Sequence, residues 1–538
     1  MFLHHILRRG GRRHVTTLAT KLFRSSSSSG IVSKPRLFSR TYDTRLISST
    51  TPTYSIDTTD DGDSFSSLRL PDNTKEIHKI LLTIAKARRE TASGTFVPKD
   101  FLQRMCDWYD RRTLSERKEF AKILASLDVP DTTTLSDQLE RYKSLTAKRK
   151  QEERNLRDAL IPYHEDVLQL IVALLPNGMK WVIDLRADVL RHLKDSNDTL
   201  LRYLDGNIKA MLKNWFGGGF LKLVRVTWEN SPGHLLEKIV AYEKVHPTRR
   251  ISDLKTRLGS GRRCFAFVHP TLPEEPLVFV HVALVPEIAS SLRYIIDKTS
   301  SEDCEDYARA AIFWSISNTQ LGLQGVDLGH LLIKRVVERL QRSESSHDDM
   351  KFSTLSPIPG FSSWLDMKLE DSEDDDDDDT LFMENEIKIL SEILNCSHSS
   401  DLFQVLRDRE FVSKRLKSDE RFRDAIQEPL LRLAAQYIVN EKKRKNQALC
   451  PVANFHIRNG AIVWRINFWA DRSERGLRQS LGLMVNYKYD LDFLETNHAR
   501  YISSGGISVD DSVSSLLSSS STSSSSSPSS SSSSLSYE

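Results

Sequence analysis

One histidine of this chain lies in a segment with a clear turn signal. His456 belongs to the stretch Val452–Phe468, in which Asn459-Gly460 separates two alternating apolar runs. This pattern predicts a β-hairpin that closes on the Asn-Gly turn. His456 would then lie on the polar face of a strand, beside Asn454 and Arg465. An imidazole in that place could act as a general acid or base, and a purely structural strand histidine is the alternative.

A serine on a stiff connection is the second chemical candidate. Ser356 lies in Thr354–Phe361, where two prolines and a glycine restrict the backbone and would hold the hydroxyl in place. The segment is not the G-x-S-x-G elbow of hydrolases, because Leu355 precedes the serine and Pro357 follows it. An ordinary Ser-Pro turn is the alternative. Serine with histidine could support acyl transfer, but the sequence offers no obvious third triad member.

The third candidate is a glycine-rich turn between an apolar strand and an amphipathic helix, within Ala310–Leu340. Gln324–Gly329 reads QGVDLG, and glycines before a helix N-terminus let a phosphate approach unpaired backbone N–H groups. The spacing matches neither the dinucleotide fingerprint nor a P-loop. It does resemble the Gln/Arg-x-x-Gly-x-Gly/Ala loop with which acetyltransferase-like folds hold the pyrophosphate of coenzyme A. A glycine-rich turn without a ligand remains the alternative.

Helical signals fill the chain from Asn73 to about residue 216. Apolar residues recur at helical spacing, for example at Ile77, Ile80, Leu81 and Ile84. Capping boxes are expected at Thr113 and Thr134, each followed three residues later by an acidic residue. We therefore predict an all-helical bundle over residues 73–216, with a structural or oligomer-forming role.

Composition changes at Gly217–Gly219, after which strand signals alternate with helical ones. Strands are expected over Phe220–Trp228, and as a pair over Cys264–His269 and Leu277–Leu284. This order predicts a mixed α/β domain over residues 217–502, and hence an α+β protein as a whole. An acidic insertion without the ligand spacing of an EF-hand is expected at residues 370–380.

Both ends of the chain have biased compositions. The first 42 residues contain no acid and nine basic residues, as in an organellar transit peptide, so residues 1–72 are interpreted as transit peptide and linker. A disordered basic tail is the alternative. Residues 503–538 are rich in serine and are expected to be disordered.

The overall numbers exclude several classes of protein. The formal net charge is only +3, so no global field points to nucleic acid. The five cysteines are far apart and show neither zinc nor disulfide spacing, which suits a reducing compartment. No apolar run is long enough to predict a membrane span.

Several strings together make the chain resemble the malonyl-CoA decarboxylase family. They are LQGVDLG, KRVVERL, TLSPIPGF, PVANFHIRNGAIVWRIN, EEPLVFVHVAL and GLMVNYKY, and the resemblance extends over about residues 73–501. The family implies an N-terminal helical domain and a C-terminal catalytic domain of acetyltransferase-like (GNAT-type) fold.

The resemblance also assigns site residues. Ser356 and His456 would be the catalytic pair, with Asn454 and Tyr489 as possible supporting residues. Substrate and CoA would be bound by that pair and by the glycine-rich loop, which comprises Gln324, Gly325, Val326, Asp327, Leu328, Gly329 and His330. Malonyl-CoA is the implied partner, with coenzyme A as part of the substrate, no separate cofactor and no metal. A homo-oligomer formed through the helical domain is expected, with no nucleic acid partner.

The implied reaction turns malonyl-CoA into acetyl-CoA and CO2 through an enolate that hydrogen-bond donors stabilise. His456 would protonate the carbon because imidazole titrates near neutral pH, and Ser356 would position the malonyl thioester. The implied role is removal of malonyl-CoA in fatty-acid metabolism. An acyl-CoA N-acyltransferase and a non-catalytic CoA-binding scaffold are the alternatives.

The leader predicts the mitochondrial matrix, with the cytosol or peroxisome as alternatives. Family members often carry a C-terminal peroxisomal tripeptide, whereas this sequence ends Ser536-Tyr537-Glu538.

Overall fold

A computed structural model describes most of the chain outside the two ends. The described residues are 69–89, 97–127, 149–217, 219–248, 250–272, 275–296, 307–326, 328–343, 350–374 and 381–518, with short helical pieces between 136 and 143. The leader expected over residues 1–72 falls almost entirely outside these residues, and so does the cap expected at Thr134. All elements below belong to the compact unit Asp63–Glu538.

The first part of the described chain is helical, as the sequence predicts. Its elements are η1 (Thr74–Glu76), α1 (Ile77–Arg89), α2 (Lys99–Asp110), α3 (Leu114–Ala125), α5 (Arg149–Ala159), α6 (Tyr163–Leu174), α7 (Gly178–Lys194) and α8 (Thr199–Trp215). The capping box before α3 is confirmed, because the Thr113 side chain accepts from the Glu116 N–H and the Glu116 side chain accepts from the Thr113 N–H. Each helix with an apolar stripe buries it; Ile77, Leu81 and Ile84 of α1 are fully buried.

A mixed sheet follows the helical part. The strands are β1 (Lys222–Val226), β2 (Arg262–Val268), β3 (Val278–Val285), β4 (Ala310–Asn318), β5 (Lys351–Thr354), β6 (Ser356–Pro357), β7 (Ile462–Asn467) and β8 (Met484–Tyr489). Their order is β1-β2-β3-β4-β5-β8-β6, and β7 also pairs with β8. The pair predicted around Cys264 and Leu277 is confirmed as antiparallel β2 and β3. Among the described strands, β4 and β5 form the one parallel pair.

The strands β4 and β5 stay paired over only part of their length. Their ladder runs from Ala310↔Lys351 to Phe313↔Thr354, and the Leu355 N–H still donates to the Phe313 carbonyl. At this point β4 carries a bulge, because His281 of β3 pairs with Ser315 and Val282 with Phe313, which leaves Trp314 as the extra residue. The strand β5 also pairs with β8, and beyond Leu355 the chain continues along β8 alone, so the parallel strands part at their carboxyl ends. In α/β sheets such a point is where ligands commonly bind.

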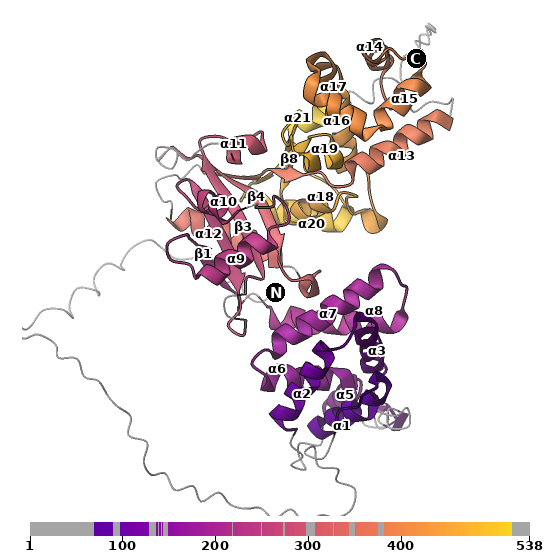
Figure 1. Ribbon diagram of the computed structural model, residues 1–538, viewed down its shortest axis with the longest axis vertical. Coiled ribbons are helices and arrows are strands. Elements are labelled where there is room, and N and C mark those ends of the chain that lie inside the picture. Colours follow the sequence, from indigo (N-terminus) through magenta and orange to yellow (C-terminus); the bar gives the residue numbers. More distant parts are fainter. Residues whose placement is uncertain are drawn as a thin grey trace, which may run out of the picture. The chain divides into compact units, whose positions relative to one another are not determined.

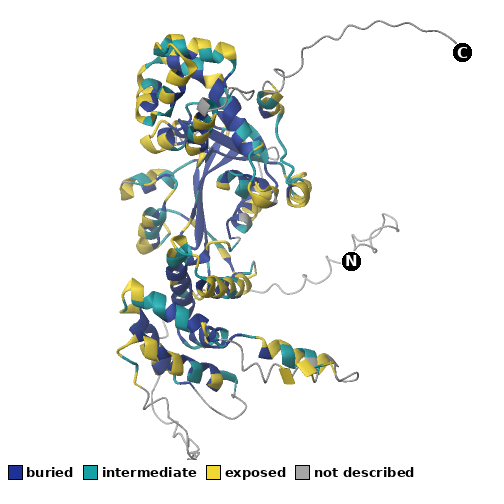
Figure 2. Cartoon of the chain, turned by 90° about the vertical axis from the view of Figure 1, so that its right-hand side faces the viewer, coloured by how far each residue is buried: buried dark blue, intermediate teal, exposed yellow. Residues whose placement is uncertain are grey.

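Helices cover both faces of this sheet. The helix α12 (Leu328–Ser343) packs with the face that carries Val280 and Val282, whereas α9 (Gly233–Tyr242) and α10 (Ile251–Arg257) pack with the face that carries Phe279. The short helix α11 (Leu292–Ile296) lies beside a smaller cluster around Ile312. Figure 2 shows most of the sheet as a buried layer, with the exposed residues mainly on the surrounding helices and loops.

A group of helices that the sequence did not predict in detail follows β6. It comprises α13 (Phe361–Asp374), α14 (Glu384–Leu394), α15 (Ser399–Arg407), α16 (Arg409–Ser418) and α17 (Glu420–Val439), with the single turn η5 (Arg444–Asn446) after it (Figure 1). The acidic segment expected as an insertion at 370–380 begins inside a helix, since α13 continues to Asp374. Residues 375–380 lie outside the described residues.

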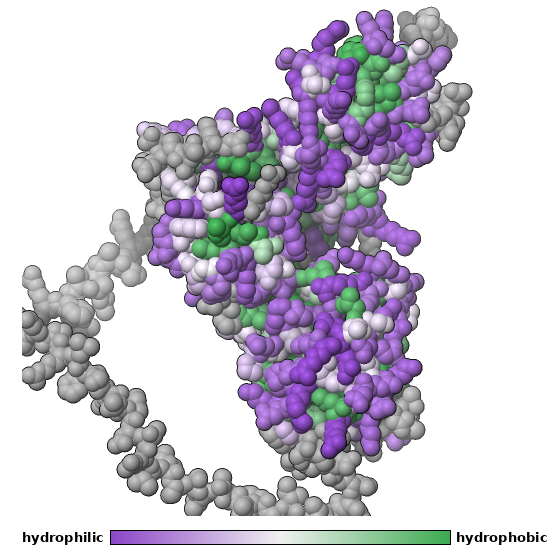
Figure 3. All heavy atoms as spheres, in the orientation of Figure 1, coloured by the Kyte–Doolittle hydropathy of each residue, from purple (hydrophilic) through white to green (hydrophobic). Residues whose placement is uncertain are grey.

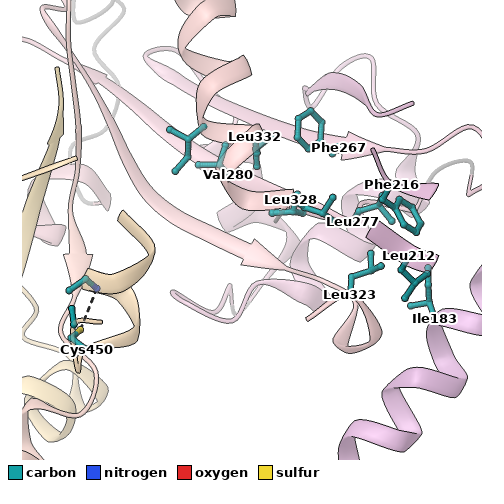
Figure 4. Packing of buried hydrophobic residues seen from close by; sticks show 14 of the residues in the cluster. Ile183, Leu212, Phe216, Phe267, Leu277, Val280, Leu323, Leu328, Leu332 and Cys450 are labelled. Carbon is teal, nitrogen blue, oxygen red and sulfur yellow. Dashed lines mark hydrogen bonds between the residues drawn. The ribbon is translucent and has the colours of Figure 1, made fainter. Parts of the chain in front are cut away.

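The predicted hairpin over Val452–Phe468 is wrong. Its first half is the helix α18 (Pro451–Arg458), and only the second half is a strand, β7. Pro451 occupies the first helical turn, where its missing N–H costs nothing, and Cys450 Sγ accepts from the Ala453 N–H as the cap (Figure 4). Gly460, with φ of +84°, ends the helix, and its N–H donates to Ile457 O. The Asn-Gly pair is thus a helix C-terminus.

The predicted disorder of residues 503–538 is wrong for residues 503–518. After α19 (Glu474–Ser480) and β8, the chain forms α20 (Leu494–Ser504) and α21 (Asp511–Ser518). Val509 bridges to Val463 of β7, and the Ser512 hydroxyl donates to Trp464 O. Val513 is buried against the core, so an apolar residue among the serines anchors this segment. Residues 519–538 are not described.

The helical part and the sheet share one hydrophobic core. Ile183 of α7, Leu212 of α8 and Phe216 lie beside Leu323 and Leu277, which belong to the sheet side (Figure 4). No helix among the described residues is long and apolar enough to cross a membrane. Hydrophilic side chains dominate the face drawn in Figure 3, with small scattered apolar patches.

Candidate functional site

Ser356 begins β6, directly after β5, where the chain keeps its pairing with β8 but not with β4. It pairs with Val485 of β8, and its hydroxyl donates to Thr354 Oγ1 at 2.9 Å. Thr354 is itself held, because its Oγ1 accepts from the Tyr487 N–H and its carbonyl accepts from Asn486 Nδ2 at 2.7 Å. The sequence prediction that this serine is rigidly placed is therefore confirmed.

The turn after Ser356 is fixed from α17. Gly360 has φ of +86°, and a Cβ there would come within 2.5 Å of the Tyr437 hydroxyl. That hydroxyl donates to Pro359 O at 2.8 Å. Only glycine fits this backbone conformation and this close approach without strain. The Pro-Gly turn thus keeps Ser356 in register with β8.

His456 comes from α18 and meets Ser356 inside the protein. Its Nε2 lies 3.2 Å from Ser356 Oγ, and its Nδ1 lies 2.7 Å from the Tyr489 hydroxyl. With the Ser356 hydroxyl donating to Thr354, the network assigns the proton to Nε2, which donates to Ser356, while Nδ1 accepts from Tyr489. Ser356 is 5% exposed and His456 is 3% exposed, so water has little access to the pair.

Burial controls the charge of this histidine. The imidazole stacks on the Tyr487 ring at a centroid distance of 4.6 Å, and loss of hydration lowers the pKa of His456 to about 3. The expectation of a near-neutral pKa is therefore wrong for the free protein, in which the imidazole is neutral. Burial also raises the pKa of Tyr489, so its phenol stays protonated and can donate.

Of the two supporting residues, only Tyr489 contacts the pair. Asn454 lies on α18 two residues before His456, and a helix turns such neighbours to different sides. Its Oδ1 accepts from the Tyr501 hydroxyl. Arg465, expected beside His456, instead donates to Asn486 Oδ1 and Ile288 O. The strand periodicity assumed for residues 452–458 caused both errors.

The glycine-rich turn leads into α12, as the sequence predicts, but only part of its backbone is available. The N–H groups of Gln324, Val326 and Leu328 donate within the turn, to Leu321 O, Leu323 O and Val326 O respectively. Gly325 has φ of +77°. Within the described residues the Gly325 N–H has no backbone acceptor.

The first turn of α12 adds further donors, since the amides of Gly329 and His330 have no acceptor inside the helix. Among the described residues of the loop, the predicted phosphate donors are therefore the amides of Gly325, Gly329 and His330. Asp327 and the His330 side chain lie outside what the structure describes.

The turn and the buried pair adjoin one another. A Cβ on Gly329, at the start of α12, would lie 3.0 Å from the ring of Phe455. Phe455 directly precedes His456 on α18, so the N-terminus of α12 packs against the helix that carries the imidazole. An anion at that N-terminus and a group at Ser356 would be held by neighbouring elements.

Sequence reasoning missed several residues that shape the site. Thr354 and Tyr487 orient Ser356 and His456, and Arg186 and Lys209 reach the turn from α7 and α8. Thr354 lies in the string TLSPIPGF and Tyr487 in NYKY, so the sequence contained a signal for both residues. The other two show no local pattern. Among the described residues, no group of three His, Cys, Asp or Glu side chains could hold a metal ion.

Comparisons with known protein families match most of the chain. The model of the malonyl-CoA decarboxylase N-terminal domain matches residues 129–216, and that of the malonyl-CoA decarboxylase C-terminal domain matches residues 219–527.

Relatives of known name agree with the family models. The chain is 41% identical over 372 residues to the mitochondrial malonyl-CoA decarboxylase of Rattus norvegicus, a match that covers 68% of this chain and 74% of the relative. The mitochondrial enzyme of Mus musculus gives the same values.

Solved structures extend the match to more of the chain. Malonyl-CoA decarboxylase from Rhodopseudomonas palustris matches with a TM-score of 0.68 at 32% identity, over 82% of this chain and 99% of that one. The structure from Agrobacterium vitis matches with a TM-score of 0.69 at 31% identity and the same coverage. The chain therefore belongs to the malonyl-CoA decarboxylase family.

Proposed function

We propose that this protein decarboxylates malonyl-CoA to acetyl-CoA and CO2, with the chemistry at Ser356 and His456. The observation that carries the proposal is the contact between Ser356 Oγ and His456 Nε2 at 3.2 Å, buried beside the N-terminus of α12. A helix N-terminus suits the phosphates of CoA, and the buried pair suits the acyl end of the same molecule. Family membership supports this substrate.

The first chemical step breaks the bond between the carboxylate and the α-carbon. Its electron pair moves into the thioester π system, so CO2 leaves and an enolate forms with negative charge on the thioester oxygen. A hydrogen-bond donor aimed at that oxygen typically lowers the barrier by about 3–4 kcal/mol. Ser356 is the proposed donor: its hydroxyl would turn from Thr354 Oγ1 to that oxygen, while the ladder with β8 holds its backbone in place.

Protonation of the α-carbon completes the reaction, and His456 is the proposed acid. In the free protein the imidazole is neutral, but the malonyl carboxylate and then the enolate bring negative charge next to it. A nearby opposite charge favours the imidazolium and raises its pKa. His456 would therefore take up one proton from solvent as the substrate binds and transfer one from Nε2 to carbon, which leaves the imidazole neutral with its remaining proton on Nδ1. Tyr489 would orient the ring through Nδ1, to which it donates while the imidazole is neutral and from which it would accept once the imidazolium forms.

No covalent acyl-serine is part of this proposal. The thioester C–S bond stays intact from malonyl-CoA to acetyl-CoA, so no acyl group has to leave CoA. Ser356 would act by hydrogen bonding alone, and no water would be consumed.

The direct test uses malonyl-CoA labelled in the free carboxyl group and supplies no amine acceptor. Release of labelled CO2 with formation of acetyl-CoA is expected. Turnover that needs an added amine would instead indicate an N-acyltransferase, and binding of CoA without turnover would indicate a non-catalytic CoA-binding protein. Either result would overturn the proposal.

The cellular location of the protein is proposed from its relatives and from the composition of its leader. The relatives from rat and mouse are named as mitochondrial, and the leader of this chain has the composition of a transit peptide; both support our proposal that the protein acts in the mitochondrial matrix. Its role there would be removal of malonyl-CoA in fatty-acid metabolism. Self-association through the helical part is proposed as well, and measurement of the molar mass in solution tests it.

A further inference from the structure

A buried arginine of the helical part holds the backbone of the glycine-rich turn. The side chain of Arg186, on α7, is 1% exposed, and it donates to Gly322 O at 2.5 Å and to Gln324 O at 2.9 Å. Its Nε donates to Asp205 of α8 at 2.8 Å. The guanidinium of Arg186 thus links α7 and α8 of the helical domain to two carbonyls of the glycine-rich turn. Its planar group of N–H donors makes all of these bonds at once.

This clamp fixes the direction of one particular N–H group. The carbonyl of Gln324 and the N–H of Gly325 belong to the same planar trans peptide and point in opposite directions. Because Arg186 binds the Gln324 carbonyl, the Gly325 N–H points away from Arg186. Gly325 is the residue of the turn with φ of +77°, and no backbone carbonyl among the described residues accepts from its oriented amide.

The turn also sits directly on α7. A Cβ on Gly322 would lie 1.9 Å from Ile183 O, so the backbones of turn and helix touch. Ile183 and Leu212 pack against Leu323 of the same turn (Figure 4). The helical part therefore fixes the position of the turn, and the clamp is not a loose surface contact.

A lysine from α8 stands at the same glycine. A Cβ on Gly325 would lie 2.7 Å from Lys209 Nζ, so the ammonium group rests against the glycine backbone. Lys209 is half-buried, and it makes no ion pair within the described part of the chain. Asp205, one helical turn before it on α8, is engaged by Arg186 instead. Among the described residues, a cation is thus held beside an oriented amide just before α12, and no carboxylate pairs with it.

We infer that the helical domain completes the CoA site: Lys209 binds the pyrophosphate together with the Gly325 amide, and Arg186 is a positioning residue for that amide. This inference rests on the proposed function, since it concerns the same substrate. An ammonium supplies a point charge that attracts phosphate, and partial burial strengthens the attraction by lowering the local dielectric. The helical domain then has a role in substrate binding besides any role in assembly.

The test compares two substrates that share the malonyl thioester. Malonyl-CoA carries the phosphates, whereas malonyl-N-acetylcysteamine ends before them. For Lys209→Ala we expect a rise of roughly tenfold in KM for malonyl-CoA, the size of one charge-assisted hydrogen bond, with kcat changed less than threefold. For the short thioester kcat/KM should stay unchanged. The effect should persist with malonyl-dephospho-CoA; its disappearance there would assign Lys209 to the 3′-phosphate and overturn the pyrophosphate contact.

Lys194→Ala is the matched control. Lys194 is an exposed lysine at the end of α7, eight residues and about 12 Å along the helix from Arg186. The variant Lys194→Ala removes the same charge from the same domain as Lys209→Ala, and it should leave KM and kcat unchanged for both substrates. If Lys209→Ala behaves like Lys194→Ala while the wild type turns over malonyl-CoA, this inference fails and the proposed function stands. A wild type without decarboxylation would instead remove the proposed function.

The positioning role of Arg186 needs its own variant. Arg186→Lys keeps the positive charge but cannot hold both carbonyls and Asp205 at once, because lysine lacks the fork. We expect KM for malonyl-CoA to rise with kcat/KM for the short thioester preserved, in a protein whose melting temperature shows that it folds. An equal loss with both substrates would indicate a general structural role and contradict the positioning role. Asp205→Asn keeps a hydrogen-bond acceptor for Arg186 Nε, so it should also raise KM for malonyl-CoA, but by less than Arg186→Lys does.

Discussion

Ser356 and His456 are 100 residues apart in the chain, and their Oγ and Nε2 atoms lie 3.2 Å apart in the fold. The serine reaches this point because β5 leaves β4 after Thr354, and the histidine reaches it because α18 ends at a glycine cap beside β8. Both residues are nearly inaccessible to solvent. The site is therefore a product of sheet topology and of one short helix.

The ionisation of His456 in the free protein is the first prediction. Loss of hydration lowers its pKa to about 3, so the imidazole should be neutral from pH 5 upwards, with the proton on Nε2. Nitrogen NMR of labelled histidine, assigned with His456→Gln, should show a neutral tautomer that does not titrate between pH 5 and 8. A midpoint between 6 and 7 would show that the imidazole is hydrated, contrary to the buried site.

The second prediction concerns the effect of removing the Tyr489 hydroxyl on turnover. In Tyr489→Phe the Nδ1 atom of His456 loses its donor, while the ring volume stays the same. One hydrogen bond contributes about 0.5–1.5 kcal/mol, so kcat should fall about three- to tenfold with KM little changed. Tyr501→Phe is a control for loss of a tyrosine hydroxyl, because Tyr501 bonds Asn454 and Ala448 and not the pair. Equal effects of the two variants would contradict a specific role of Tyr489.

Two glycines, one in the turn that packs on α7 and one on the exposed side of α8, should change stability in opposite directions when replaced by alanine. Gly322→Ala places a Cβ 1.9 Å from Ile183 O and must displace the turn from α7, so it should lower the melting temperature and weaken CoA binding. Gly206→Ala, within α8, meets nothing within 4 Å and should stabilise the helix by about 0.5–1 kcal/mol. Thermal unfolding of both variants measures this. A neutral Gly322→Ala would show that the turn does not rest on α7.

Stability should fall in mild acid because several histidines are buried in the neutral form. Burial lowers the pKa of His281 to about 3 and that of His246 to about 4, and that of His456 is also low. The unfolded chain binds protons below about pH 6.5, whereas the native state does not until far lower pH. The contribution of these histidines to the free energy of unfolding is thus fully present above pH 6.5 and is lost as the pH falls.

Below pH 6.5, each such histidine lowers the free energy of unfolding by up to about 1.4 kcal/mol for each pH unit. Urea unfolding at pH 7.5, 6.5 and 5.5 checks this dependence. His281→Gln should make it shallower, since it deletes one of the groups. The same slope in His281→Gln and wild type would assign the acid sensitivity to other groups.

The sequence predicted the candidate residues better than the elements that carry them. Ser356 was placed on a stiff connection, and the structure agrees, because Pro357 and Gly360 restrict the backbone wherever they occur. His456 was assigned to a hairpin, since Asn459-Gly460 serves both hairpin turns and helix ends. A type I′ turn needs positive φ at both residues, whereas Asn459 has φ of −88°. Pro451 at the helix start was the signal that separates the two readings.

Other features had no local signal at all. Arg186 bonds carbonyls 136 and 138 residues later in the chain, and no spacing in the sequence relates them. Val513 lies in a serine-rich segment whose composition predicts disorder, yet it is buried. Such contacts depend on how whole elements pack, and only tertiary structure shows them.

The most direct measurement is release of labelled CO2 from malonyl-CoA by the wild type, Ser356→Ala and His456→Ala, each checked for its fold by circular dichroism. Loss of the proton donor should reduce kcat by about 10²–10⁴, and loss of the oxyanion donor by about 10²–10³. CoA should still bind both variants, because the turn before α12 is intact. Near-normal turnover by either folded variant would contradict the assignment of that residue.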